Sequence, residues 1–235
     1  MKKIVALNHK MYLEYSDVNK YIEEMKDNIR KDIEVVICPS SIFIPYFKGK
    51  YDFKLGAQNV TGVFASGENS GAQLKSMDVL YTIVGHSERK QVLKEENEMT
   101  NLNLQEALKY GIIPILCVGE TKEQREMKKT GEVIRKQLKD YLKDVKVEES
   151  LVIAYEPVWA IGTGLIPNND EIEEVIKLIK DIVFKAHGKN IRVLYGGSVN
   201  EKNVDELVKV PYCDGFLLGS VSKDPKNVLY VINAV

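Results

Sequence analysis

The alternation of short apolar runs with longer charged segments most strongly constrains how this chain can fold. The apolar runs cover residues 3–7, 34–38, 54–57, 81–84, 112–118, 151–154, 191–194 and 215–218. Their length and β-branched content predict about eight strands. Charged segments with helical spacing of apolar residues lie between several of them, most clearly over 133–142 and after Asn169. This alternation predicts parallel strands with crossover helices, which close at about eight units into a (β/α)8 barrel. A doubly wound open sheet is the alternative.

The length and punctuation of the chain predict one domain. The sequence has 235 residues, and α/β barrels of about this length are commonly single domains. Pro and Gly mark the ends of the predicted elements, and no long low-complexity linker interrupts them. We therefore expect a single α/β domain over residues 1–235.

Composition and charge exclude several classes of function. Lys and Arg number 33 against 34 Asp and Glu, so no overall basic field favours nucleic acid or a membrane surface. The three cysteines and three histidines are scattered, which predicts free thiols and no metal site. The apolar run near the N-terminus ends too early for a signal peptide or a membrane span. The expected protein is soluble and cytoplasmic.

One segment, residues 153–164, has the pattern of a catalytic base below a mobile loop. A predicted strand ends at Glu156, and the carboxyl ends of barrel strands are where such folds place their chemistry. Pro157 and the pair Gly162 and Gly164 would act as hinges around the apolar tip 158–161, which could close over a ligand and exclude water. The simpler interpretation of Glu156 is a loop residue at a strand end.

Two further strand ends carry polar groups. Lys10 follows the first strand, where an ammonium could attract an anionic substrate and stabilise an oxyanion, and Asn8 could orient it from the same strand face. His86 follows the fourth strand, and Ser87 is the predicted N-cap of the next helix. The positive end of that helix would keep the imidazole neutral, so that it could donate to a carbonyl oxygen and exchange protons. A solvated lysine and a structural histidine are the alternatives.

Two other features indicate contacts. Glu88 and Arg89 are interpreted as a structural charge pair, with a contact from Glu88 to Lys10 as the alternative. The longest candidate loop covers residues 60–71, and an exposed Phe64 there would indicate a partner surface.

Two glycine-bearing turns predict a phosphate site. Gly196, Gly197 and Ser198 follow the seventh strand, and Gly219 and Ser220 follow the eighth. Glycine lets backbone N–H groups approach an anion closely, and the loops after strands seven and eight frequently hold phosphate in (β/α)8 barrels. Either turn taken by itself could serve only to reverse the chain, without binding a ligand.

Six motifs together resemble the triosephosphate isomerase family, in that family's order and over nearly the whole chain. They cover residues 8–11, 84–89, 117–120, 154–164, 195–199 and 214–219. The resemblance implies a TIM barrel without a cofactor that isomerises a small phosphorylated sugar. Dihydroxyacetone phosphate and D-glyceraldehyde 3-phosphate would interconvert through an enediolate, as part of glycolysis and gluconeogenesis in the cytoplasm.

The resemblance also implies a role for each matched position. Glu156 corresponds to the base, His86 to the electrophile and Lys10 to the electrostatic helper, an arrangement that is the family's established mechanism. The positions that would hold the substrate or its phosphate are Asn8, Lys10, Gly162, Ser198, Gly219 and Ser220.

Four positions depart from the family's pattern. His9 stands where Trp is usual, Tyr12 where Asn is usual, Leu165 where Lys is common, and Ser220 in place of a second Gly. The added Cβ and hydroxyl of Ser220 could narrow or repolarise the phosphate site. An isomerase of a four-carbon ketose phosphate is therefore one alternative, and a phosphosugar-binding protein without turnover is another.

The segment 60–65 is shorter than the family's dimer-forming loop, although the sequence Ser66-Gly67-Glu68 resembles the tip of that loop. The resemblance implies a homodimer, and we expect Phe64 and this tip at its interface.

Overall fold

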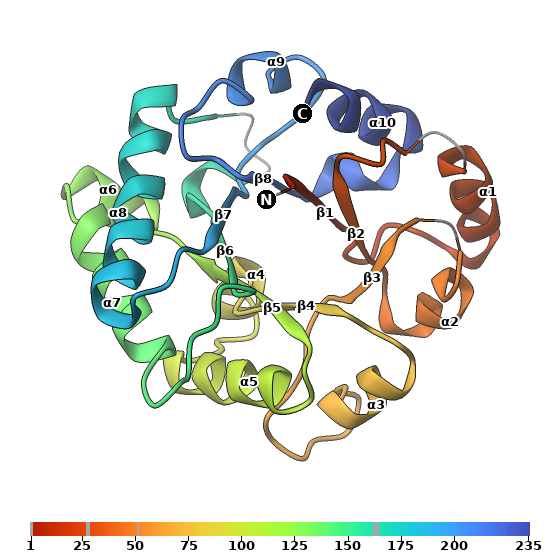
Figure 1. Cartoon of the computed structure of the whole chain (residues 1–235), viewed down its shortest axis with the longest axis horizontal. Coiled ribbons are helices and arrows are strands. Elements are labelled where there is room, and N and C mark those ends of the chain that lie inside the picture. Colours follow the sequence, from red (N-terminus) through yellow and green to blue (C-terminus); the bar gives the residue numbers. More distant parts are fainter. Residues whose placement is uncertain (1, 27–28, 51, 162–164) are drawn as a thin grey trace.

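Eight parallel strands form a closed barrel in the computed structural model, which describes residues 2–26, 29–50, 52–161 and 165–235. Each strand pairs with the next in sequence, and β8 pairs with β1 (Figure 1). The strands are β1 Ile4–Asn8, β2 Glu34–Cys38, β3 Lys54–Ala57, β4 Tyr81–Val84, β5 Ile113–Val118, β6 Val152–Tyr155, β7 Arg192–Tyr195 and β8 Gly215–Leu218. The prediction of a single-domain (β/α)8 barrel is confirmed, and the open sheet is excluded.

Strand positions follow the apolar runs closely. The runs predicted for β2, β3, β4 and β8 match residue for residue, while β1, β6 and β7 begin and end one residue later than predicted. The extra residues continue the ladder of a neighbour, since Asn8 pairs with Cys38 and Tyr155 pairs with Tyr195. Neighbouring strands thus decide where a strand ends.

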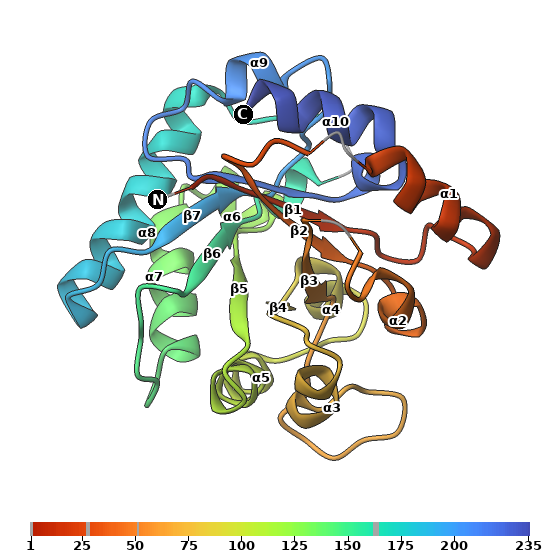
Figure 2. The same cartoon turned by 45° about the vertical axis from the view of Figure 1, so that its right-hand side comes forward.

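Helices surround the barrel, as Figure 1 and Figure 2 show. They are α1 Tyr15–Met25, η1 Ser41–Phe43, α2 Ile44–Phe47, α3 Gly71–Ser76, α4 Ser87–Gln91, α5 Asn97–Lys109, α6 Lys122–Glu126, α7 Thr130–Tyr141, η2 Val158–Ala160, α8 Asn169–His187, α9 Val204–Leu207, η3 Ser220–Lys223 and α10 Pro225–Ala234. Helix α8 lies beside α7, and α10 lies beside α1.

The longest helix, α8, illustrates why these segments are helical. Asn168 and Glu171 form a capping box at its start, and Gly188 ends it with a φ of 66°. The predicted apolar stripe is buried: Ile172, Val175, Ile176, Ile179 and Val183. Helical period and caps therefore agree with the observed boundaries.

The core has two layers because strand side chains alternate between faces. Ile4 and Ala6 of β1 lie in the cluster inside the barrel, whereas Val5 and Leu7 lie in the cluster between strands and helices. This packing fixes the strands rigidly, so that their carboxyl ends present side chains at one rim.

The opposite end of the barrel is closed by a polar cluster. Arg192 pairs with Glu34 at 2.8 Å, and the Tyr81 hydroxyl donates to the same carboxylate at 2.8 Å. Burial raises the pKa of Glu34, but Arg192 and Tyr81 outweigh it, so the net direction is downward.

Candidate active site

A cavity of about 210 Å³ at the carboxyl ends of the strands collects the predicted site residues. It is lined by Asn8, Lys10, His86, Glu156, Ser198, Gly219 and Ser220, together with Tyr12 and Ile161. These residues come from the ends of five strands and from the loops that follow them. Gly162 was also predicted to bind substrate, but it lies outside the described residues.

Glu156 is buried at the end of β6 with only 2% of its surface exposed. Its backbone N–H donates to Val118 at 2.7 Å, which extends the strand ladder to the base. One carboxylate oxygen lies 3.1 Å from His86 Nε2, and the other accepts the Ser87 N–H at 3.0 Å. Burial raises the pKa of Glu156, but the lowering effect of His86 and the Ser87 amide is larger. The net direction is downward. This direction favours the carboxylate form, which the predicted role of base requires.

His86 itself caps α4. Its Nδ1 accepts the Glu88 N–H at 3.3 Å, so His86 is the N-cap and Ser87 is the first helical residue. The prediction that Ser87 caps this helix is therefore wrong. The backbone of His86 is not helical, and its ring accepts an N–H of the first helical turn. His86 thus occupies the N-cap position, and Ser87 already lies inside the helix. Because Nδ1 accepts a hydrogen bond, the hydrogen-bond network assigns the ring proton to Nε2, which faces Glu156.

The charge of His86 depends on two opposing neighbours. Burial lowers its pKa, the Glu156 carboxylate raises it, and the net direction is upward. The Glu88 amide at the start of the helix acts against protonation, because a protonated Nδ1 could not accept its hydrogen bond. The helix terminus thus favours the neutral imidazole expected from the sequence, and contact with the carboxylate opposes it.

Lys10 is held in place through both its backbone and its ammonium. Its φ of 46° lies in the left-handed region, which is uncommon for a residue with a side chain. Its N–H donates to Asn8 Oδ1 at 3.1 Å, and its carbonyl accepts from Ser40 and Gln58, each at 2.8 Å. Its Nζ contacts Glu88 at 2.7 Å, which confirms the contact considered as the alternative.

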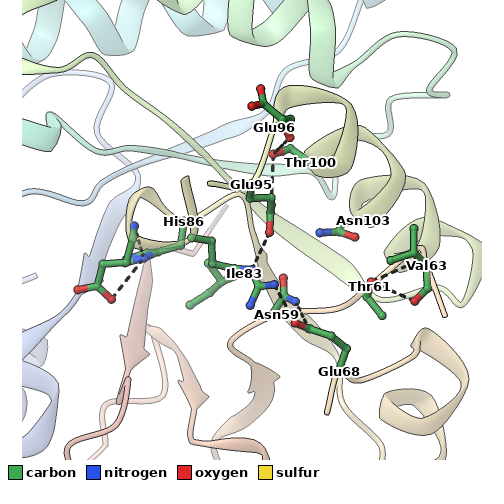
Figure 3. Close-up of polar contacts among 12 residues, drawn as sticks. Asn59, Thr61, Val63, Glu68, Ile83, His86, Glu95, Glu96, Thr100 and Asn103 are labelled. Carbon is green, nitrogen blue, oxygen red and sulfur yellow. Dashed lines mark hydrogen bonds and ion pairs between the residues drawn. The ribbon is translucent and has the colours of Figure 1, made fainter. Parts of the chain in front are cut away.

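The preferred pairing of Glu88 with Arg89 is wrong. Arg89 instead bonds Glu95 at 2.6 Å and Glu68 at 3.0 Å. Successive helix residues point in different directions, so the two side chains cannot face each other. Figure 3 shows the surrounding network, in which Asn59 donates to Glu68 and Thr100 to Glu95.

The two glycine turns lie at the edge of the same cavity. A Cβ at Gly197 would come within 2.2 Å of the Tyr195 hydroxyl, so this turn requires glycine. Ser220 begins η3, where backbone amides lack helical partners and can face an anion. The Ser198 hydroxyl donates to the Ala160 carbonyl at 2.6 Å, which links the first turn to the segment after the base.

The segment after Glu156 is anchored by Glu120, a residue for which no role was predicted. Glu120 is completely buried and accepts from the Trp159 indole at 3.0 Å and from the Tyr155 hydroxyl at 3.2 Å. Arg125 pairs with Glu120 at 3.5 Å and lies over the Trp159 ring. The available signal was the motif 117–120, which places a carboxylate at the end of β5.

The described residues hold neither a cluster of metal ligands nor a membrane-spanning helix. They contain no group of three or more His, Cys, Asp or Glu side chains that could hold a metal ion. No helix among them is long and apolar enough to cross a membrane.

The fold is a (β/α)8 barrel, and its cavity brings together groups that are suited to acid–base chemistry. A carboxylate and an imidazole in contact, a nearby ammonium and two glycine turns lie in one cavity. The sequence profile of the family described as "TIM: Triosephosphate isomerase" matches residues 3–235. The chain belongs to the triosephosphate isomerase family and is an isomerase.

Relatives from several bacteria match over nearly their whole length. The chain is 39% identical to the triosephosphate isomerase of Dictyoglomus turgidum, with 99% of each chain covered. It is 41% identical to that of Gloeothece citriformis, over 99% of this chain and 98% of the relative. The corresponding protein of Clostridium tetani is 38% identical, over 99% and 96%.

Proposed function

We propose that this enzyme interconverts dihydroxyacetone phosphate and D-glyceraldehyde 3-phosphate in glycolysis and gluconeogenesis. The observation that carries the proposal is the buried Glu156 carboxylate, 3.1 Å from His86 Nε2 in a cavity shared with Lys10. A base, a hydrogen-bond donor and a cation around one cavity are the groups that a proton shift beside a carbonyl requires.

Glu156 begins the reaction by removing a proton from C1 of dihydroxyacetone phosphate. The electrons of that C–H bond form the C1–C2 double bond of an enediolate, and the carbonyl oxygen becomes an oxyanion. Lys10 and the Nε2–H of His86 stabilise this oxygen. His86 exchanges a proton between the two oxygens, and Glu156 then returns its proton to C2. The product is the aldehyde, and no cofactor takes part.

Substrate grip comes from the two glycine turns. The amides around Ser198 and at Gly219 and Ser220 would hold the phosphate, and Asn8 fixes the backbone of Lys10. Gly162 is proposed to contribute its N–H by position in the family's motif. These contacts leave the phosphate fixed while the reacting carbons lie over Glu156.

A homodimer is part of this proposal. Phe64 is fully exposed, Met11 is 93% exposed on the loop after β1, and Ile42 is 72% exposed in η1, which follows β2. The neighbouring tip is held inward, because Glu68 bonds Arg89 and Asn59. An ordered loop that presents Phe64 to solvent is better explained by a partner copy than by water.

We further propose that the enzyme works in the cytoplasm. Cys38, Cys117 and Cys213 are free, and the first two are buried within strands. Free thiols of this kind fit a reducing compartment.

A coupled assay on both triose phosphates tests the proposed reaction. We expect turnover in both directions and a higher kcat/KM for the triose phosphates than for a tetrulose phosphate. Glu156→Gln, which keeps the shape of the side chain but cannot accept the proton, should fold and lose turnover. A preference for the four-carbon substrate would favour the alternative isomerase, and binding without turnover would favour the phosphosugar-binding protein.

A further inference from the structure

Lys90 is a partly buried lysine of α4 that lies on the inner side of the helix carrying His86. Its Nζ hydrogen-bonds the hydroxyl of Tyr141 and lies 4.2 Å from the centre of that ring. Tyr141 is completely buried, so the lysine reaches inward and not to solvent. In the described part of the chain, no carboxylate forms an ion pair with Lys90.

Lys90 and the base face the same small cavity, which is separate from the substrate cavity. It has a volume of about 20 Å³ and is lined by Ser87, Lys90, Cys117, Gln137 and Glu156, among others. A polar cavity of this size has room for one water molecule. Glu156 therefore lies between two cavities, with substrate on one side and Lys90 on the other.

Charges interact strongly in this partly dry region. Burial lowers the pKa of Lys90 to about 8, while the carboxylates of Glu156 and Glu95 act to raise it. Burial raises the pKa of Glu156, and His86, the Ser87 amide and the nearby Cys117 thiol lower it, so that the net direction is downward. Lys90 and Glu156 are thus coupled through a cavity in which both have polar neighbours.

The other charged groups around Lys90 are compensated by their own partners. Glu95 is bonded by Arg89 at 2.6 Å, and Asp140 is paired with Lys136 at 2.8 Å. Glu88, on the same helix as Lys90, pairs with Lys10. Burial strongly raises the pKa values of Tyr141 and Cys117, so both are neutral. Glu156 is the anion whose charge Lys90 can balance.

We propose that Lys90 is a positioning residue for the proton transfer: its ammonium stabilises the Glu156 carboxylate from the cavity behind the base. This rests on the proposed function, in which Glu156 is the base. His86 holds the carboxylate on the side of the substrate cavity, and the Ser87 amide donates to its other oxygen. With Lys90 charged, Glu156 stays ionised to lower pH; with Lys90 neutral, its pKa rises.

Nuclear magnetic resonance of protein labelled with 13C-lysine tests the coupling without any turnover. The Cε–H signal of Lys90 is assigned by its loss in Lys90→Arg, and the signal is followed from about pH 6 to about pH 10. The coupling is mutual, so removing the charge of Glu156 must lower the midpoint of Lys90. We expect a downward shift of about one pH unit in Glu156→Gln, the size that a neighbouring opposite charge commonly produces.

The matched control is Glu149→Gln, at an exposed carboxylate near the opposite end of the barrel. It should leave the Lys90 midpoint unchanged. The same midpoint in Glu156→Gln and in the parent protein would overturn the proposal. That result would not affect the outcome of the isomerase assay. A folded parent protein without turnover would refute the proposed function, and the Lys90 midpoint would still decide whether Lys90 and Glu156 are coupled.

A second measurement follows the acid limb of kcat/KM against pH. We expect Lys90→Met to move this limb upward by about one pH unit. Lys90→Arg should keep the parent profile, since the charge remains, and Lys20→Met, at a side chain 79% exposed, should do the same. Ionisation of the substrate phosphate affects the parent and all variants equally, so it cancels when their pH profiles are compared. If folded Lys90→Met has the same pH profile of kcat/KM as the parent, the proposal is contradicted. If that variant does not fold, the titration midpoint of Lys90 in Glu156→Gln decides.

Discussion

The indole N–H of Trp159 donates to the buried carboxylate of Glu120 at 3.0 Å. This bond joins the segment after the base to the end of β5. The Val158 N–H donates to the Glu120 carbonyl at 3.0 Å, so the same residue holds the segment through both its side chain and its backbone. The position of the proposed lid is therefore set by a buried charge outside the substrate cavity.

Removing the donor from this pair should destabilise the protein. We expect Trp159→Phe to lower the free energy of unfolding by about 1–3 kcal/mol, because a buried carboxylate loses a charge-assisted hydrogen bond. Tyr155→Phe removes the other donor to Glu120 and should have a similar effect. Denaturant unfolding of both variants gives the measurement. Unchanged stability in both would show that Glu120 does not depend on these bonds.

His9 should make the stability depend on pH. Its ring is buried against Tyr21 and Phe47, neither nitrogen has a partner among the residues that the structure describes, and burial lowers its pKa from 6.5 to about 3. Between these values the unfolded chain binds a proton that the folded protein does not, so stability falls as the pH falls through this window. One such proton changes the free energy of unfolding by about 1.4 kcal/mol per pH unit.

The variant His9→Phe isolates this contribution. Carboxylates also titrate at low pH, so the quantity to compare is the difference between the parent and the variant. We expect the parent to lose about 2 kcal/mol more than His9→Phe between about pH 7 and about pH 5. Parallel stability curves over this range would mean that His9 is hydrated or partnered in solution.

Assembly depends on Phe64 in the proposed homodimer. Sedimentation of the parent should give a dimer at micromolar concentration, and Phe64→Asp should give a monomer because a charge would be buried at the contact. Phe184→Asp is the matched control, since Phe184 is 53% exposed on α8 and should leave the dimer intact. A monomeric parent would contradict the prediction and would point to the short segment 60–65 as the reason.

The tip 158–161 is expected to protect the intermediate. An enediolate phosphate in contact with water can expel its phosphate instead of accepting a proton, and a closed lid excludes that water. Deleting the tip should leave proton abstraction largely intact and raise the ratio of phosphate release to isomerisation. The two rates are measured in the same reaction. If they fall together at a constant ratio, the tip only positions the substrate.

The sequence predicted the barrel well because its strands are short, buried and rich in β-branched residues. The contact between Lys10 and Glu88 was harder to predict, since it joins residues 78 apart and exists only because β1 and β4 open onto the same rim. The cap of α4 was predicted wrongly because serine is the commoner cap, whereas the backbone turn at His86 gives its ring that position. Glu120 and Lys90 act from beneath the site, and their partners are set by packing that no local pattern reveals.

The proton abstraction by Glu156 is the central claim, and exchange of the substrate C1 proton with D2O measures it most directly. Glu156→Asp shortens the side chain by one methylene and withdraws the carboxylate by roughly 1 Å, which should slow exchange and turnover about 100-fold. Affinity for inorganic phosphate, which would be held by the glycine turns and Gly162 and not by Glu156, should stay close to that of the parent. Exchange at the parent rate in folded Glu156→Asp would contradict the account and remove Glu156 from the role of base.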